Sequence, residues 1–374
     1  MLTFLLALGI SLVATLLVVR SARAHGHFSA DHDFSGPQKF HAQAVPRVGG
    51  VGIMVGLVAA TVFLAFTSLP TAKWAALLLI CGLPAFVAGL VEDVTKRVSP
   101  RYRLLAVAGS ALMAVWLMDA SVTKADVPGL DFLLAIPVVA AALTIFGVAG
   151  FANSINIIDG FNGLASMCVI IMLGALCYVA FQSDDLVVAT LALAGIGAVL
   201  GFFIWNFPAG LIFLGDGGAY FLGFFVAEVS ILLLARNPGE VSPLFPLLVC
   251  IYPVFETLFS IYRRRFLRAM PPTMPDGIHL HSLIYRRMIR WAVGNQSAKA
   301  LTRRNSMTSP YLWFLCMLSV VPAVVFWNNT PVLALFLLLF AVTYVGLYWR
   351  IVRFRAPRWM IFPGNGRPDA PKDT

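Results

Sequence analysis

Four short motifs hold the acidic, amide and imidazole side chains best suited to chemistry in this 374-residue chain. Carboxylate and amide oxygens are the hard ligands that Mg²⁺ takes in proteins, and imidazoles can bind phosphate. Such a set suits a site that handles phosphate groups. The motifs are GLVEDVTKRVSP with Glu92 and Asp93, NSINIIDGFNGLA with Asn153, Asn156, Asp159 and Asn162, IFLGDGGAYFLGF with Asp216, and PDGIHLHSL with Asp276, His279 and His281.

The second motif places Asn153, Asn156, Asp159 and Asn162 at a strict three-residue interval. If its first part is helical, this spacing keeps successive oxygens within an arc of about 120°. Such an arc suits coordination of one hard cation. Asp159-Gly160 and Asn162-Gly163 are also strong turn dipeptides, so a polar connection between two apolar segments is the alternative.

The first and third motifs have structural alternatives as well. Glu92 and Asp93 end an apolar segment, where the helix dipole disfavours carboxylates, but Lys96 and Arg97 stand close enough for a salt-bridge cluster. Asp216 lies among glycines at the predicted start of a helix. Glycines there let a ligand approach the backbone, whereas a single aspartate can simply cap the helix.

The fourth motif combines an Asp276-Gly277 turn with two histidines that are two residues apart. In extended chain His279 and His281 share a side. A zinc site would require further ligands, and the motif has no cysteine. Binding of phosphate is therefore favoured over zinc, with an ordinary surface turn as the alternative.

The apolar segments around these motifs predict an all-α polytopic membrane protein. The chain is 60% apolar and 12% charged, where a soluble domain carries about 25% charge. Its apolar blocks approach the length that crosses about 30 Å of hydrocarbon as a helix. About eleven transmembrane helices are expected, in blocks 2–19, 48–68, 73–91, 104–120, 132–152, 163–182, 187–206, 211–234, 243–262, 311–327 and 332–349.

The basic residues predict the orientation of these spans. No basic residue precedes the first block and Arg20 and Arg23 follow it, which favours a retained span with its N-terminus outside over a signal peptide. The C-terminus and the four motifs are then cytoplasmic, because 24 of the 27 basic residues fall on the inside. The inside segments are 20–47, 92–103, 151–162, 205–217, 263–310 and 350–374.

One transmembrane catalytic domain is expected over residues 1–349, with a cytoplasmic tail over 350–374. A short interfacial helix is predicted at 280–291. Glu228 and Glu256 lie within apolar blocks, where an ionisable residue is a functional candidate. The net charge of +10 comes from loops that flank spans, so anionic headgroups rather than nucleic acid are the expected partners. The five cysteines have no paired or metal-type spacing and are interpreted as small hydrophobes.

From Lys39 to about Arg287 the chain resembles the polyprenyl-phosphate N-acetylhexosamine-1-phosphate transferases. KFHAQAVPRVGG is similar to the first inside loop of that family, VEDVTKR to its acidic-pair loop, and NSINIIDGFNGLA to its Asn/Asp signature. FLGDGGAYFLG is similar to its Gly-Asp motif and PDGIHLH to its His loop. The motifs occur in the family's order on alternate inside loops.

The resemblance implies a reaction in which a polyprenyl (undecaprenyl) phosphate attacks the β-phosphorus of a UDP-N-acetyl sugar and UMP leaves. It implies roles for individual residues as well. Asn156 and Asp216 would hold Mg²⁺, with Mn²⁺ as a second possible ion, and Asp93, Glu92 and Asp159 would be catalytic. The implied substrate-binding residues are Asn153, His279, His281, Asp276, Lys39, Arg47, Arg101 and Arg103.

The chain departs from the family pattern at three positions. Glu92 replaces the usual first Asp of the acidic pair, Asn162 replaces an acid, and Ser282 stands where many members carry a further His. These departures favour Asp93 over Glu92 and make Asn162 unsuitable as a base. They leave Asn156, Asp159, Asp216 and His279 in place.

Two other classes of membrane protein are alternatives to the transferase. A secondary transporter of an anionic substrate would place ionisable residues near mid-membrane in repeated halves. A CDP-alcohol phosphatidyltransferase would require an Arg and later acids that DGFNGLAS lacks. The sequence therefore predicts a multi-pass enzyme of the inner or plasma membrane. It would start a surface polysaccharide such as the lipopolysaccharide O-antigen, and a homodimer is an additional expectation.

Overall fold

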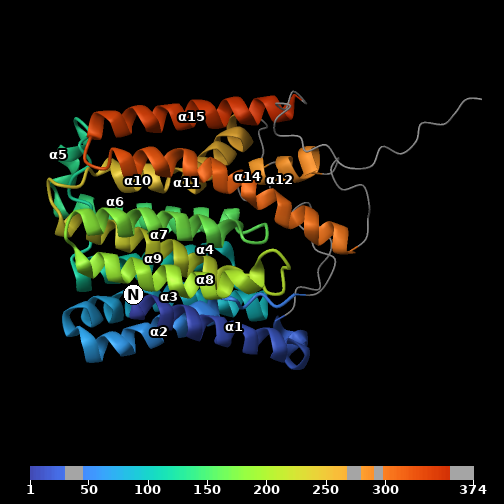
Figure 1. Ribbon diagram of the computed structural model, residues 1–374. Coiled ribbons are helices and arrows are strands. Elements are labelled where there is room, and N and C mark those ends of the chain that lie inside the picture. Colours follow the sequence, from blue (N-terminus) through green and yellow to red (C-terminus); the bar gives the residue numbers. More distant parts are fainter. Residues whose placement is uncertain (30–44, 268–278, 290–297, 354–374) are drawn as a thin grey trace, which may run out of the picture.

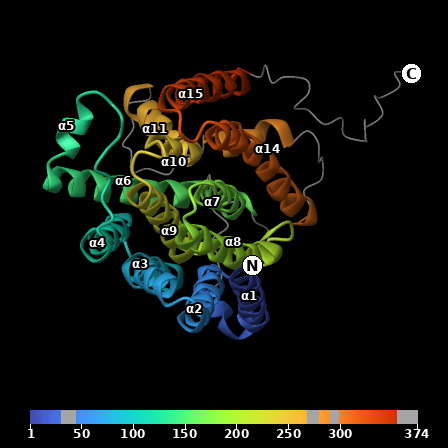
Figure 2. The same cartoon turned by 60° about the vertical axis from the view of Figure 1, so that its left-hand side comes forward.

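The computed structural model describes residues 1–29, 45–267, 279–289 and 298–353, and within these ranges the chain forms helices and no strand. Ten helices in this part of the chain are long and apolar enough to cross a membrane. They lie side by side in one bundle, with α9 near its centre (Figures 1 and 2). The helices are α1 (Leu2–Ser29), α2 (Gly50–Thr67), α3 (Leu69–Thr95), α4 (Pro100–Met118), α5 (Leu130–Leu134), α6 (Pro137–Ile158), α7 (Leu164–Gln182), α8 (Leu186–Asn206), α9 (Gly215–Arg236), α10 (Leu244–Val249), α11 (Ile251–Tyr262), η1 (Arg263–Leu267), α12 (Leu280–Ile284), η2 (Tyr285–Ile289), α14 (Ala298–Val325) and α15 (Thr330–Val352).

The predicted span at 243–262 is divided into α10 and α11, which accounts for the difference between eleven predicted blocks and ten long helices. The break lies at Cys250, between Val249 and Ile251. Pro253 has no N–H to donate to the carbonyl of Val249 four residues earlier, so a continuous helix is interrupted there. The chain still runs from one end of the bundle to the other through this pair, because Ser242 contacts α15 at one end and Glu256 contacts His279 toward the other.

Hydrogen bonds gather the predicted outside loops at one end of the bundle. Thr330 donates to Asp126 at 2.9 Å and lies 2.7 Å from the hydroxyl of Ser242. Arg236 forms an ion pair with Asp185 at 2.8 Å. The predicted inside loops meet at the other end, where α12 lies (Figure 1). The alternation of the spans therefore agrees with the predicted topology, and the assignment of this second end to the cytoplasm stays a prediction.

The first helix is packed into the bundle against α8. The Ser11 hydroxyl donates to the carbonyl of Ala198 at 2.6 Å, and the Trp205 indole donates to the carbonyl of Leu12 at 3.0 Å. A β-carbon on Gly197 would lie 2.4 Å from the carbonyl oxygen of Phe4. α1 and α8 therefore approach closely through small residues, as membrane helices commonly do.

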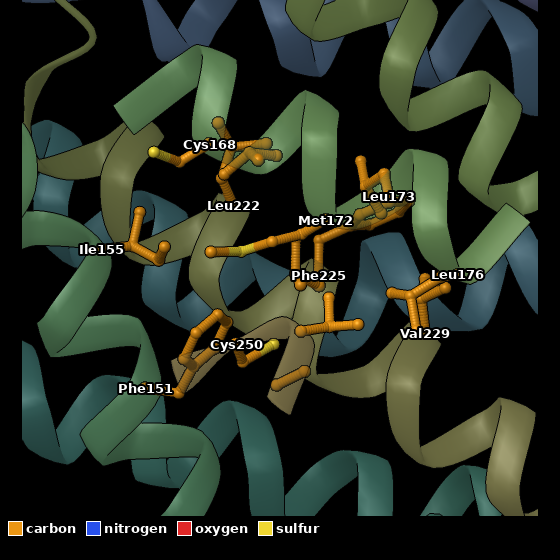
Figure 3. Close-up of a cluster of buried hydrophobic side chains, with 14 of the residues drawn as sticks. Phe151, Ile155, Cys168, Met172, Leu173, Leu176, Leu222, Phe225, Val229 and Cys250 are labelled. Atoms are coloured by element: carbon orange, nitrogen blue, oxygen red, sulfur yellow. The ribbon is translucent and has the colours of Figure 1, made fainter. Parts of the chain in front are cut away.

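Buried apolar side chains of α6, α7 and α9 form the core of the bundle (Figure 3). Phe151 and Ile155 of α6, Met172 of α7 and Phe225 of α9 lie together there. All five cysteines are buried with free thiols, which confirms their interpretation as small hydrophobes. Glu228 is fully buried in α9, and neither of its carboxylate oxygens has a hydrogen-bond partner among the described residues.

Glycines allow α2 and α3 to touch the amino end of α9. A β-carbon on Gly89 of α3 would lie 2.5 Å from the backbone nitrogen of Gly217, and one on Gly50 of α2 would lie 2.5 Å from Gly218. Real side chains do not fit at these distances, so only glycine permits the contacts. The acidic motif of α3 and the Gly-Asp motif of α9 therefore come together at one point.

We expect Gly89→Ala to reduce the free energy of unfolding by about 1–3 kcal/mol, the usual cost of overpacking. The added methyl group would press on the backbone of Asp216 and Gly217. Thermal unfolding in detergent measures the effect. Gly109→Ala is the matched control, because nothing lies within 4 Å of a β-carbon at that position in α4. Equal melting temperatures for the two variants would contradict the close contact.

Candidate active site

Asp216, in the first turn of α9, is the residue on which the site converges. Its carboxylate oxygen Oδ1 accepts a hydrogen bond from Asn156 Nδ2 at 3.0 Å and lies 3.4 Å from a guanidinium nitrogen of Arg47. Its other oxygen forms an ion pair with Arg103. The Asp216 side chain is nearly buried, so these contacts are weakly screened. The predicted metal ligands Asn156 and Asp216 are therefore neighbours.

Asp93, near the end of α3, holds the start of α9. Its two carboxylate oxygens accept the backbone N–H groups of Asp216 and Gly217, each at 2.9 Å. Arg47 Nε lies 3.9 Å from Asp93, whose exposed fraction is 1%. The first N–H groups of a helix have no partner within it, and here a carboxylate from another helix supplies one. Both oxygens of Asp93 are thus engaged with the backbone that carries Asp216.

The chain before α2 brings Arg47 to this point. Phe213 donates its N–H to the carbonyl of Pro46, and Gly49 donates to the carbonyl of Phe213, each at 2.9 Å. Gly215 has a φ of +77°, a conformation that favours glycine. A β-carbon on Gly215 would lie 2.0 Å from the carbonyl oxygen of Arg47. The Gly-Asp motif is therefore glycine-rich because two segments of backbone meet there.

The motif NSINIIDGFNGLA begins within α6, as the helical interpretation of its first part predicts. The helix continues through Asn153 and Asn156 to Ile158. Asn153 accepts a hydrogen bond from the Tyr220 hydroxyl at 3.4 Å, and the guanidinium of Arg103 lies 5.8 Å from the centre of the Tyr220 ring. Asn153 and Asn156 thus face α9 and its neighbours, one turn apart.

Asp159 caps the end of α6, and its N–H donates to the carbonyl of Asn156 at 3.3 Å. The residue is partly exposed. The low-dielectric surroundings of its carboxyl nevertheless raise the pKa of Asp159 well above its usual range; the charge of Arg47 opposes this shift, and the carboxylate of Asp93 adds to it. Asp159 therefore belongs electrostatically to the same cluster.

The rings of His279 and His281 are nearly parallel, and they lie beside the loop that follows α6. Their ring centres are 5.0 Å apart, and the planes differ by 14°. His279 Nδ1 lies 3.0 Å from Glu256, whose carboxylate also accepts the N–H of Leu280 at 3.0 Å and the hydroxyl of Tyr344 at 2.7 Å. Glu256 thereby fixes the orientation of the His279 ring at the start of α12.

The remaining predicted site residues are not among the partners of Asp216 in the part of the chain that the structure describes. Glu92 accepts the N–H of Val98 at 2.7 Å and so closes the turn between α3 and α4. Arg101 is exposed, and no hydrogen bond or ion pair joins it to another described residue. Lys39 and Asp276 lie outside the described residues. Asp93, Asn153, Asn156, Asp159, Asp216, Arg47, Arg103, His279 and His281 are thus at the same end of the bundle.

The cluster offers oxygen donors for a cation. No group of three or more His, Cys, Asp or Glu side chains suited to a metal occurs in the part of the chain that the structure describes. Mg²⁺, however, commonly takes one or two protein oxygens together with substrate phosphates and water. The Asp216 carboxylate and the Asn156 amide are adjacent, and turning the amide, whose N and O are not distinguished by shape, directs its oxygen to Asp216. The donor set therefore fits one magnesium ion.

Comparison with known proteins extends over most of the chain. Residues 74–234 match the family described as Glycosyl transferase family 4. The chain is 30% identical over 281 residues to a Bacillus subtilis protein named "Probable undecaprenyl-phosphate N-acetylglucosaminyl 1-phosphate transferase", which covers 74% of this chain and 75% of that protein. The chain belongs to glycosyl transferase family 4. It is a multi-pass membrane enzyme of the polyprenyl-phosphate N-acetylhexosamine-1-phosphate transferase type, as its motifs predict.

Other members of family 4 are similar over different shares of the chain. A Yersinia pestis protein named "Undecaprenyl-phosphate alpha-N-acetylglucosaminyl 1-phosphate transferase" is 26% identical over 327 residues, or 85% of this chain and 84% of that protein. A Streptococcus thermophilus "Phospho-N-acetylmuramoyl-pentapeptide-transferase" is 32% identical over 161 residues, or 42% of this chain and 47% of that protein. Membership of this family favours the transferase over the transporter and the CDP-alcohol enzyme.

Sequence reasoning missed two contributors to the site of this family 4 enzyme. Tyr344 on α15 and Tyr220 on α9 contact Glu256 and Asn153 through their hydroxyls, and nothing in the sequence singles out either tyrosine. Glu256 is a functional candidate from the sequence because it is an acid within an apolar block, and in the structure its carboxylate contacts His279. Glu228, flagged on the same grounds, lies twelve residues after Asp216 in α9, about 18 Å along the helix.

Proposed function

We propose that this enzyme transfers N-acetylglucosamine 1-phosphate from UDP-N-acetylglucosamine to undecaprenyl phosphate. Similarity over 74% and 85% of the chain to two proteins named for this reaction supports the choice of sugar and lipid. The observation that carries the proposal is the convergence of Arg47, Arg103 and Asn156 on Asp216. This arrangement places cationic and oxygen-donor groups together at one end of a membrane bundle, where a lipid phosphate can reach them.

In the proposed reaction an oxygen of the lipid phosphate forms a bond to the β-phosphorus of the nucleotide sugar. The bond from that phosphorus to the oxygen shared with the α-phosphate breaks, and UMP leaves with the electron pair. The lipid phosphate is mostly ionised at neutral pH, because the second pKa of a phosphate monoester is about 6. The protein's main task is therefore to bring two anions together and to stabilise the charge on the leaving group.

The residues divide this task among them. Arg47 and Arg103 are positioned to bind phosphate oxygens, and His279 and His281, oriented by Glu256, are positioned to bind the diphosphate. Asn156 and Asp216 would hold Mg²⁺ or Mn²⁺, and such an ion would offset the charge of the phosphates. Asn153 and Asp159 line the same region as candidate contacts of the nucleotide sugar. Asp93 keeps Asp216 in place through the backbone of α9.

The site is proposed to face the cytoplasm, where nucleotide sugars are available. The asymmetry of basic residues supports this orientation. The product would be the lipid-diphosphate-linked first sugar of a cell-surface polysaccharide, such as a lipopolysaccharide O-antigen.

The purified protein is expected to release UMP from UDP-N-acetylglucosamine only when undecaprenyl phosphate and Mg²⁺ are both present. A panel of UDP-sugars, assayed for UMP in detergent, tests the reaction and the sugar together. Omission of the lipid is the control for simple hydrolysis. The absence of turnover with every UDP-sugar, with lipid and metal supplied, would overturn the proposal, and turnover with a different UDP-sugar alone would correct the substrate.

A further inference from the structure

The loop that follows α6 is held by side chains of α14, a helix outside the family motifs described above. The N–H of Asn162 donates to Asn305 Oδ1 at 2.7 Å, and Asn162 Nδ2 donates to the Ser306 hydroxyl at 3.2 Å. The Ser309 hydroxyl donates to the carbonyl of Asn162 at 2.6 Å. Asn162 and Asn305 are both buried. Three residues of α14 therefore bind one residue of the loop through both its backbone and its side chain.

The next residue of the loop is held from a second side. Gly163 has a φ of +74°, its N–H donates to Asn206 Oδ1 at 2.6 Å, and its carbonyl accepts the indole N–H of Trp313 at 3.0 Å. Asn206 in turn donates to the carbonyl of Ile212 at 2.7 Å, which ties the end of α8 to the segment before α9. We call the contacts of Asn162 and Gly163 with Asn206, Asn305, Ser306, Ser309 and Trp313 the loop clasp.

The loop clasp fixes the segment that carries Asp159 and Phe161. The Phe161 ring lies with its centre 5.4 Å from that of His281 and 5.6 Å from that of Tyr285, and it contacts the two rings edge-on and tilted. A β-carbon on Gly160 would lie 3.7 Å from His281 Nε2. A displacement of this short loop would therefore move both Asp159 and the imidazole of His281.

The clasp also explains the amide at position 162, where the resemblance leads one to expect an acid. The Asn162 side chain donates to Ser306, whose single hydroxyl proton is within reach of the carbonyls of Pro208 and Thr302. A carboxylate cannot donate a hydrogen bond, and one buried at this position without a partner would be costly. Asn162 therefore contacts α14 as a donor, which a carboxylate could not do, while its Oδ1 has no hydrogen-bond partner among the described residues.

We propose that Asn305 is a positioning residue for the transfer reaction. It acts through Asn162 and Phe161 to hold Asp159 and His281 where the nucleotide diphosphate binds. The inference rests on the proposed function, and it adds α14 to the elements that build the site. Among the described residues, Asn305 hydrogen-bonds to the N–H of Asn162 and to no side chain of the proposed catalytic cluster.

The test compares Asn305→Leu with Asn237→Leu in purified enzyme. Leucine has the same branched skeleton of four side-chain heavy atoms as asparagine, although it is larger, and it accepts no hydrogen bond. Asn237 is also buried, with its amide bonded to Asp185 and to the carbonyl of Leu233, but it lies at the opposite end of the bundle. We expect both variants to lower the melting temperature. Only Asn305→Leu should lower kcat, by about tenfold, because small misplacements of reacting groups slow catalysis strongly.

A double-mutant cycle separates positioning from a general loss of stability. If Asn305 acts through Phe161, the effects of Asn305→Leu and Phe161→Leu on kcat will not multiply, whereas those of Asn237→Leu and Phe161→Leu will. Ser309→Ala removes another contact of the same clasp. It should lower kcat by about threefold, and it serves as the test if Asn305→Leu does not fold.

Wild-type turnover, measured first as UMP release from UDP-N-acetylglucosamine, distinguishes failure of this inference from failure of the proposed function. If the wild type is active, any one of three results overturns the inference. The kcat values of Asn305→Leu and Ser309→Ala could both lie within twofold of the wild-type kcat, or Asn237→Leu could lose as much kcat as Asn305→Leu. In the third case, the effects of Asn305→Leu and Phe161→Leu on kcat would multiply. An inactive wild type would refute the proposed function on its own account.

Discussion

Asp216→Ala is expected to abolish UMP release, with a loss of at least about 10²–10³-fold in kcat. The Asp216 carboxylate is the point on which Arg47, Arg103 and Asn156 converge. Its removal takes away the one carboxylate proposed to hold Mg²⁺ and the anion that the two guanidinium groups share. The protein should remain folded, because the backbone N–H of residue 216 can still donate to Asp93.

The experiment measures UMP release at saturating UDP-N-acetylglucosamine, lipid and Mg²⁺, together with thermal unfolding in detergent. Asp126→Ala provides the control, since Asp126 also pairs with a basic residue, Lys124 at 2.7 Å, but at the other end of the bundle. Its activity should be that of the wild type. An Asp216→Ala enzyme that kept more than one tenth of wild-type activity would remove Asp216 from the metal site.

The helical membrane fold could be predicted from the sequence, because the length of each apolar block can be seen in the order of the residues. Ten of the eleven predicted spans correspond to long helices of the described chain. The exception, 243–262, has the composition of a span, but Pro253 divides it into α10 and α11. Hydropathy averages over a block and does not detect such a break. The presence of proline would not have indicated the break either, because Pro84 lies within α3 and Pro310 and Pro322 lie within α14, which are continuous helices.

The position of the motifs at one end of the bundle could also be predicted. An even number of spans separates successive motifs, so their loops lie on the same side of the membrane. The contacts between particular residues could not. Asp93 was expected to be catalytic, and no sequence pattern shows that its two oxygens accept the N–H groups of Asp216 and Gly217. Those bonds depend on the close contact of α3 with α9 at Gly89. Partners more than a hundred residues apart are fixed by packing rather than by local sequence.

The same limit applies to Glu256 and Asn162. An acid in an apolar block indicates a polar partner, but only the folded bundle identifies that partner as His279. In the sequence, Asn162 differs from the family pattern only in carrying no charge. Its hydrogen bond to Asn305, 143 residues later in the chain, is found only in the structure. Local motifs therefore suggest candidate site residues, and the helices that hold those residues are identified only from the folded structure.

Asp93→Ala is expected to reduce both the stability and the activity of the enzyme. Two buried N–H groups would lose their acceptor, at a cost of about 1–3 kcal/mol each, so the melting temperature should fall. The start of α9 would then no longer hold Asp216, and kcat should fall by about 100-fold or more. Asp93→Asn keeps one acceptor oxygen and should give an intermediate loss of both quantities.

A role for Asp93 as a general base predicts a different pattern. Asparagine would then abolish the reaction as completely as alanine does, although it keeps one acceptor oxygen and lowers the melting temperature less. Asp185→Ala is the control for a loss of activity that follows from lower stability alone. Asp185 is likewise a buried aspartate that caps a helix, accepting the N–H of Val188 at 3.2 Å, and it lies at the opposite end of the bundle. Its loss should lower the melting temperature and leave kcat unchanged. A parallel decline of stability and kcat through Asp93→Asn to Asp93→Ala, not shared by Asp185→Ala, would identify Asp93 as the residue that positions Asp216.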